Sequence, residues 1–218
     1  MEIEKNYPYS LESSPAISED WDDKLAKWIS WVFSPTALIV LGFWVIAYSI
    51  GTVDAWVWTI FFFFFSVVIK SIYILLKVKR GEITDFHMKV RRQRIQPMLL
   101  ILCLSVIGWL ILWIEEAPIL IIVFAGAGCF QIAFLLFVTL RWKISGHSTA
   151  ASAFSIFIFA LFGRFAFPVL LLIPLMAWAR VHRHRHEMLQ TIAGSFAGGI
   201  YIILVLYLIN INHINLNL

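Results

Sequence analysis

Long apolar runs, separated by short polar segments, are the feature that most constrains the fold of this chain. About 20 apolar residues in an α-helix span a bilayer core, and a helix satisfies its own backbone polar groups in lipid. Only 14% of the 218 residues are charged and 61% are hydrophobic, whereas soluble domains carry about 25% charged residues. The sequence therefore predicts an all-α integral membrane protein, a bundle of about six to seven transmembrane helices. The predicted helical runs are 34–51, 55–76, 98–114, 118–140, 148–164, 166–180 and 190–209.

Short breaker segments separate these runs. Gly51 and Asp54 end the first run, and "EEAP" at 115–118 predicts a tight hairpin between the third run and the fourth. A single helix over 148–180 would be about 50 Å long, which exceeds the bilayer core of about 30 Å. We therefore expect a short helical pair that is interrupted at "GRFAFP", residues 163–168.

The chain divides into an N-terminal segment, residues 1–33, and a polytopic membrane domain, residues 34–218. The first thirty residues are polar and lack an apolar signal-peptide core, so we expect no cleaved signal. Residues 17–31 place acids before lysines, with Trp21 and Trp28 on an apolar stripe at helical spacing. This pattern predicts either an amphipathic helix on the membrane surface or the first turns of the opening transmembrane helix.

Counting membrane crossings places three polar segments on one face. Two predicted spans lie between 89–97 and 143–147, and two more lie between 143–147 and 180–190. Even numbers of crossings return the chain to the same side, which is also the side of the N-terminus. These segments carry most of the Arg and His residues. The opposite face receives short acidic loops and the C-terminus.

Cations gathered at a helix-lined mouth form a site for a multiply charged anion, and phosphate is the usual one. A histidine beside such a site can act as nucleophile or as general acid. The alternative is topological, since Lys and Arg collect in cytoplasmic loops whatever the function. That explanation is the better one for a group of loop cations: Lys77, Lys79, Arg80, Arg183 and Arg185.

We expect no metal site and no cofactor. His182, His184 and His186 alternate with arginines that would repel a cation, and no carboxylate cluster joins them. Cys103 and Cys129 both lie inside apolar runs, which is typical of small buried hydrophobic residues rather than of a disulfide or a metal site.

Two short motifs follow each other in a fixed order within this basic set. The first is Ser145-Gly146-His147, and the second is Arg180, five residues, then His186. Together with a preceding basic segment that ends in Pro, they resemble the type 2 phosphatidic acid phosphatase superfamily of membrane phosphatases. The resemblance covers about residues 85–200 and implies an all-α membrane enzyme with a basic phosphate site at one membrane face.

Two elements depart from the common family pattern. The usual first element is Lys-x6-Arg-Pro, but here Lys89 lies seven residues before Gln96, and Pro97 follows. "RRQRIQP" at 91–97 instead resembles a divergent branch of the family that reads like Arg-Lys-Glu-Arg-Ile-Ile-Pro. Gln190 stands where the family usually has a carboxylate, and the divergent branch also tolerates Gln there.

The resemblance implies a role for each matching residue. His186 would be the nucleophile that forms a phosphohistidine, and His147 would protonate the leaving oxygen. Gln190 would orient the His186 ring, although an amide stabilises an imidazolium less than a carboxylate does. The groups that would hold the substrate phosphate are Lys89, Arg91, Arg94, Lys143, Ser145, Gly146 and Arg180. We expect the two imidazoles to converge on one mouth of the bundle.

These observations lead us to expect a phosphatase acting on a lipid or isoprenoid phosphate or pyrophosphate. Its partners would be membrane lipids and that substrate, with no nucleic acid. The positive-inside rule predicts a multi-pass protein of an inner or plasma membrane, with the N-terminus and the site facing the cytoplasm. The alternative is a non-catalytic membrane subunit or lipid-headgroup binder that uses the same basic face. A channel or transporter is disfavoured, because the spans between 98 and 140 carry no charged residue to line a path.

One stripe of small and polar residues predicts close helix packing. Gln190, Gly194 and Gly198 recur every four residues and so lie on one face of a helix. Such stripes let helix backbones approach closely in lipid, where packing rather than hydrophobicity drives association. We therefore expect residues 190–199 to pack tightly against another helix.

Overall fold

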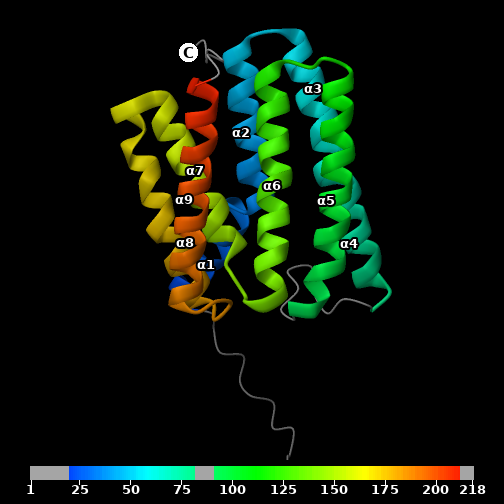
Figure 1. The fold of residues 1–218 in the computed structure, drawn as a ribbon. Coiled ribbons are helices and arrows are strands. Elements are labelled where there is room, and N and C mark those ends of the chain that lie inside the picture. The colour runs from blue at the N-terminus through cyan, green and yellow to red at the C-terminus, as the bar shows by residue number, and fades with distance from the viewer. Residues whose placement is uncertain (1–19, 82–90, 212–218) are drawn as a thin grey trace, which may run out of the picture.

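The computed structural model describes residues 20–81 and 91–211, and for residues 91–94 and Ile211 it describes the backbone alone. The described residues form helices and no strand (Figure 1). The helices are α1 (Trp21–Val32), α2 (Pro35–Ile50), α3 (Val53–Phe63), α4 (Ile69–Lys79), α5 (Arg91–Ile114), α6 (Ile119–Arg141), α7 (Gly146–Phe162), α8 (Leu172–His182) and α9 (Met188–Ile211). A π-helical turn, η1 (Phe64–Val68), joins α3 to α4, and a 3₁₀ segment, η2 (Gly163–Leu171), joins α7 to α8.

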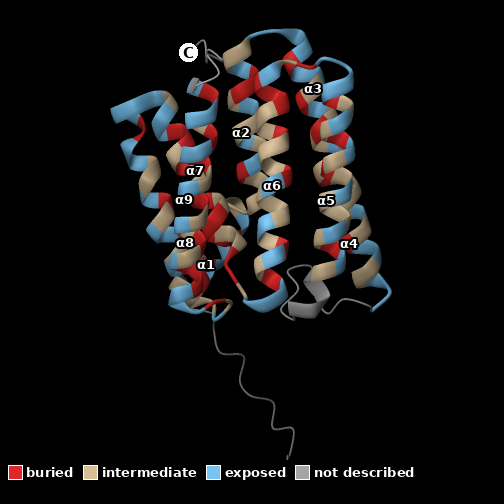
Figure 2. Cartoon of the chain, viewed as in Figure 1, coloured by how far each residue is buried: buried red, intermediate tan, exposed pale blue. Residues whose placement is uncertain are grey.

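The protein is an all-α membrane bundle, as the sequence predicts. Five helical segments of the described chain are long and apolar enough to cross a membrane, and α1 with α2, bent by 46° at their junction, would make a sixth. Exposed residues surround the bundle (Figure 2), and large apolar residues are among them, for example Phe130, Phe137 and Phe196. Such a surface suits lipid, because a monomer in water rarely exposes so wide an apolar area.

Each predicted run is mostly α-helical, but the second run also contains η1 and the sixth begins within η2. The second span runs from Val53 to Lys79 because Thr52 caps α3, its Oγ1 accepting a hydrogen bond from the amide of Ala55. The fifth begins at Gly146, because Ser145 caps α7 in the same way through the amide of Ser148. Polar caps extend a helix beyond its apolar run, since they satisfy the amides of the first turn.

The stretch from Gly146 to His182 is a hairpin of two short arms, as expected. Gly163 ends α7 with a positive φ of 57°, a conformation that glycine adopts without strain. The chain then turns back through η2, and α8 lies along α7 (Figure 1). Ala151 of α7 accordingly packs in one buried cluster with Met176 and Ala179 of α8.

α1 is an amphipathic helix that is bent by 46° from α2 and is not continuous with it. It ends at Val32, and Ser34 then caps α2 ahead of Pro35. Its buried residues, Ala26 and Ile29, join the cluster of α7 and α8. The helix therefore docks on α8, with its tryptophans largely exposed.

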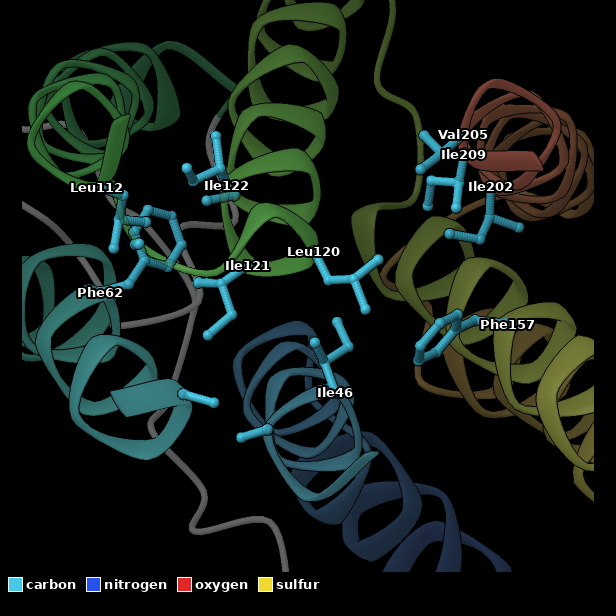
Figure 3. Packing of buried hydrophobic residues seen from close by; sticks show 14 of the residues in the cluster. Ile46, Phe62, Leu112, Leu120, Ile121, Ile122, Phe157, Ile202, Val205 and Ile209 are labelled. Atoms are coloured by element: carbon cyan, nitrogen blue, oxygen red, sulfur yellow. The ribbon is translucent and has the colours of Figure 1, made fainter. Parts of the chain in front are cut away.

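The main core lies between α2, α3, α5, α6, α7 and α9 (Figure 3). Ile46, Leu112 and Ile121 are almost wholly buried there. Successive spans run through the bundle in opposite directions. The α2–α3 and α5–α6 turns and η2 therefore lie at one end of the bundle, and the α6–α7 and α8–α9 loops lie at the other (Figure 1). The end of the bundle that holds the α6–α7 and α8–α9 loops is called the loop end below. It also holds the C-terminal end of α4 and the N-terminal end of α5.

Candidate functional site

The two motif segments meet at the loop end. The backbone N–H of Ser145, just before α7, donates a hydrogen bond to the carbonyl oxygen of Gln190 in the first turn of α9, at 3.2 Å. The N-terminal ends of α7 and α9 are thus joined directly, although 44 residues lie between Ser145 and Gln190. This contact confirms the shared face that the crossing count predicts for these two segments.

The arginine-to-histidine spacing has a structural basis in the α8–α9 loop. The carbonyl oxygen of Arg180, in the last turn of α8, accepts hydrogen bonds from the backbone N–H groups of Arg185 (3.1 Å) and His186 (3.3 Å). His184 between them has a positive φ of 48°, which turns the loop back on itself. Five intervening residues therefore bring His186 beside Arg180, and the side chains of both are buried.

A hydrogen bond from His186 to Gln190 fixes the orientation of the His186 ring. His186 Nδ1 lies 3.0 Å from Gln190 Oε1, and the backbone N–H of Glu187 lies 3.4 Å from the same oxygen. Because that amide group can only donate, the atom facing it must be the carbonyl oxygen of Gln190. The same oxygen then accepts from Nδ1–H of His186. The neutral ring consequently has its lone pair on Nε2.

The start of α7 is organised by buried hydroxyl groups. Ser145 Oγ accepts hydrogen bonds from the amide of Ser148 (3.3 Å) and from its Oγ (3.0 Å). Thr149 Oγ1 donates to the Ser145 carbonyl oxygen at 3.0 Å. Gly146 is the first residue of α7, and a Cβ placed on it would meet no atom within 4 Å. Open space thus adjoins a helix N-terminus, where backbone N–H groups favour anions.

For most of the remaining predicted site residues, the structure gives the position in the fold but not the contacts that would define a role in the site. Lys143 and His147 are half-buried on the same α6–α7 segment, so the convergence of the His147 and His186 imidazoles stays a prediction. Arg91 and Arg94 belong to the first turn of α5, at the same end of the bundle, but their side chains lie outside the described residues. Lys89 also lies outside them.

The glycine stripe of α9 packs against α7, which confirms the predicted close contact. A Cβ on Gly194 would stand 2.7 Å from the Ser145 carbonyl oxygen, and a Cβ on Gly198 would stand 2.9 Å from the Thr149 carbonyl carbon. Real Cβ atoms do not approach so closely. The two backbones can therefore lie at this separation only because both positions are glycine.

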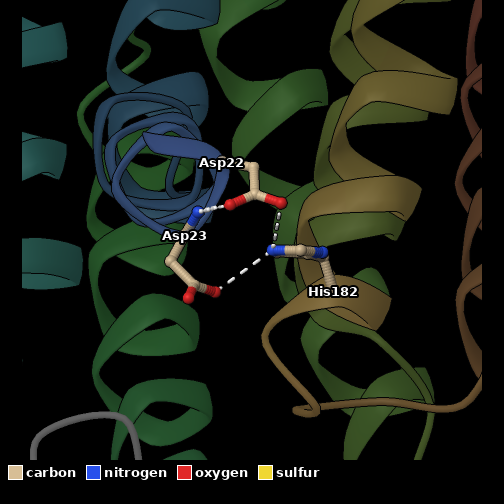
Figure 4. A network of polar contacts seen from close by, with 3 residues as sticks. All are labelled: Asp22, Asp23 and His182. Carbon is tan, nitrogen blue, oxygen red and sulfur yellow. Dashed lines mark hydrogen bonds and ion pairs between the residues drawn. The ribbon is translucent and has the colours of Figure 1, made fainter. Parts of the chain in front are cut away.

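Two carboxylates of α1 meet His182, a contact that the sequence analysis missed (Figure 4). His182 Nε2 lies 3.1 Å from an oxygen of Asp23 and 3.7 Å from an oxygen of Asp22. The expectation that no carboxylate cluster joins the histidines was therefore wrong for His182. The acids at 22–23 and His182 are present in the sequence, but only the docking of α1 on α8 brings them together. The Asp side chains are partly exposed, so the ion pairs contribute at most about 1 kcal/mol to docking.

Comparison of the chain with models of known protein families, with curated proteins and with solved structures found no significant match.

Proposed function

We propose that this protein is a membrane phosphatase that hydrolyses a lipid or isoprenoid phosphate or pyrophosphate through a phosphohistidine on His186. The observation that carries the proposal is the pair formed by His186 and Gln190. A nucleophilic imidazole needs its lone pair on one nitrogen and a fixed hydrogen bond on the other, and the Gln190 oxygen provides the latter. The buried Arg180 side chain comes from the last turn of α8, just before the loop of His186, where it can neutralise a phosphate.

The proposed reaction has two steps. In the first, Nε2 of His186 attacks phosphorus, an N–P bond forms, the P–O bond to the leaving group breaks, and His147 gives the leaving oxygen its proton. In the second, a water attacks the phosphohistidine, the N–P bond breaks, and His147 takes the proton of the water. Ser145, Gly146, Lys143 and the arginines would stabilise the charge on the other phosphate oxygens.

One residue favours a second candidate function. Gln190 carries no charge, so it orients the imidazole but stabilises the imidazolium less than a carboxylate would. A non-catalytic lipid-headgroup binder would use the same cations without needing that charge. The two functions differ in whether phosphate is released.

We also infer that the protein lies in an inner or plasma membrane and that its loop end faces the cytoplasm. Lys77, Lys79 and Arg80 lie at the end of α4 that adjoins it, whereas the α5–α6 turn at the other end carries Glu115 and Glu116. This distribution follows the positive-inside rule. The substrate would then be an amphipathic phosphate present on the inner side of the membrane.

Replacing His186 by Ala tests the mechanism. We expect release of phosphate from mixed lipid and prenyl phosphates to fall to background, because no N–P bond can form. Wild-type protein incubated with ³²P-labelled substrate and quenched in alkali should retain an acid-labile label on His186. His147→Ala should slow hydrolysis of a monoester by about 10²–10⁴-fold and slow a pyrophosphate less, because a phosphate leaving group needs less protonation.

His184→Asn is the matched control, since His184 is an exposed histidine of the same loop and Asn tolerates its positive φ. We expect this variant to retain the wild-type rate. Turnover that survives His186→Ala unchanged would overturn the phosphohistidine mechanism. Binding of lipid phosphates without any release of phosphate would favour the headgroup binder.

A further inference from the structure

A cavity of about 350 Å³, partly open to the outside of the bundle, is bordered by α2, α3, η1, α4, α5, α6, α7 and α9. Its wall is mostly apolar, with polar side chains from Ser66, Ser105, Gln131 and Tyr201 among the lining residues. Ile46, Phe62, Phe157 and Ile202, which belong to the packed core in Figure 3, also line the cavity. Cβ atoms placed on two of its glycines, Gly42 and Gly128, would meet nothing within 4 Å. The space is therefore open, and its chemistry suits a hydrocarbon chain.

The cavity has a polar end close to the proposed phosphate site. Gly146 and Thr149, from the first turn of α7, line it there. Thr36, in the first turn of α2, and Lys70 of α4 line it as well. Since α2 and α7 both begin in the half of the bundle toward the loop end (Figure 1), the residues of these first turns mark the side of the cavity nearer to that end.

Lys70 brings an amino group to this polar end. Its Nζ lies 3.2 Å from Thr36 Oγ1, which is the one polar partner of Lys70 among the residues that the structure describes. A neutral hydroxyl does not compensate a charge within an apolar wall, and intramembrane cations commonly bind a ligand or an opposite charge. The wall therefore favours an anionic ligand over a neutral one.

The size of the cavity limits the number of chains. At about 30 Å³ per carbon, the volume share of a water molecule, 350 Å³ holds about a dozen carbons. The helix rise gives about 16 Å between Gly146 and Phe157, both of which line the cavity. An extended chain of similar carbon number has that length. Two acyl chains do not fit within this volume.

We propose that this cavity holds the single hydrocarbon chain of an anionic amphiphile, with the acidic group at the end lined by Gly146 and Lys70. Gly146 belongs to both the cavity and the proposed phosphate site. If the proposed function holds, the substrate is accordingly a monoalkyl or prenyl phosphate and not a diacyl lipid phosphate. The preference for a ligand with one hydrocarbon chain can be measured as binding, without any hydrolysis of the ligand.

Binding of dodecylphosphonate, which cannot be hydrolysed, tests the cavity directly. Full-length protein in lipid nanodiscs is titrated with the radiolabelled compound and competed with butylphosphonate and with a diacyl phosphatidic acid. We expect butylphosphonate to compete at least about tenfold more weakly, because it fills little of the apolar volume. The diacyl lipid should not compete. Competition by butylphosphonate and by the diacyl lipid as strong as that by unlabelled dodecylphosphonate would overturn the proposal.

Variants that fill the cavity identify the binding place. Gly128→Leu and Gly42→Leu each extend a side chain into open space from a different helix, and we expect each to weaken dodecylphosphonate binding at least about tenfold. Ala160→Leu is the matched control, since Ala160 is exposed on α7 and does not line the cavity. Wild-type binding in folded Gly128→Leu and Gly42→Leu proteins would contradict the proposal.

Lys70→Met tests the charge. It preserves side-chain length and should weaken dodecylphosphonate about tenfold while leaving binding of dodecanol unchanged. Equal losses of affinity for both compounds would show that Lys70 does not select an anionic ligand.

Hydrolysis of phosphates with the same series of chains distinguishes the cavity proposal from the proposed phosphatase function. Chain-selective binding without hydrolysis would refute the phosphatase and support the cavity, whereas hydrolysis of butyl and diacyl phosphates at the dodecyl rate would refute the cavity alone.

Discussion

Gln190 holds three parts of the site through one residue. Its side-chain oxygen accepts from the His186 ring and from the Glu187 amide, and its backbone carbonyl accepts from the amide of Ser145. The residue therefore sets the ring orientation and the contact between α7 and α9 together. The side-chain bonds need only an oxygen acceptor, which a carboxylate of equal length would also supply.

Gln190→Glu is expected to raise the rate of phosphate release. Glu keeps the length of Gln and both acceptor contacts, while its charge stabilises the imidazolium and raises the basicity of the ring. An increase of one unit in the pKa of the imidazole corresponds to about 1.4 kcal/mol, so a gain of up to about tenfold in kcat is expected. The measurement is steady-state release of phosphate from the best substrate in nanodiscs.

Gln190→Leu serves as the control for that gain. It leaves the Glu187 amide and the Nδ1–H group of His186 without this acceptor, at a cost of about 1–3 kcal/mol in stability, and should lower both kcat and the midpoint of thermal unfolding. A rate for Gln190→Glu below that of wild type, with unchanged stability, would show that the neutral amide is required.

The helices themselves follow closely from local sequence. The breaks between apolar runs in the sequence include Gly51, Pro118 and Gly163. In the structure a helix ends or begins at or beside each of these residues. The π-helical turn at Phe64–Val68 was not predicted. Its residues continue the same apolar run, so neither hydropathy nor periodicity distinguishes a π turn from an α turn there.

The contact between α7 and α9 supplies a test at the level of elements. Gly198→Ala is expected to destabilise the bundle by about 1–3 kcal/mol, because its methyl group would overlap the backbone of Thr149. The measurement is thermal or denaturant unfolding in detergent. Gly42→Ala is the control, since its methyl group enters open space. That variant should be unchanged or more stable by about 0.5–1 kcal/mol. Equal midpoints for the two variants would contradict close packing.

For the whole molecule, the sequence predicts which segments share an end but not which side chains touch. Counting membrane crossings is enough to predict that Ser145 and Gln190 lie at the same end, because each span takes the chain to the opposite side and two spans return it. The docking of α1 on α8, and with it the contact of His182 with Asp22 and Asp23, depends on tertiary packing. The internal cavity likewise depends on how several helices pack together. No local pattern carries that information.

Accessibility of single cysteines tests the arrangement and its orientation. Trp142→Cys and Glu115→Cys are placed in a protein lacking Cys103 and Cys129, and intact cells are treated with a membrane-impermeant maleimide. Both positions are exposed, at opposite ends of the bundle. We expect the Glu115→Cys protein to react at once and the Trp142→Cys protein to react only after the membrane is permeabilised. The reverse pattern would invert the orientation, and equal reaction would refute the topology.

The pairing of α7 with α9 also has a consequence for biosynthesis. Buried Ser148, Thr149 and Ser152 lie on the first half of α7, and glycines of α9 contact them. The ribosome completes α7 and α8 before it begins α9, so these hydroxyl groups enter the membrane ahead of the helix that will cover them. A nascent chain arrested before Gly194 would therefore present a polar stripe to lipid or to the insertion machinery. The contact between Ser145 and Gln190 would form only when α9 arrives.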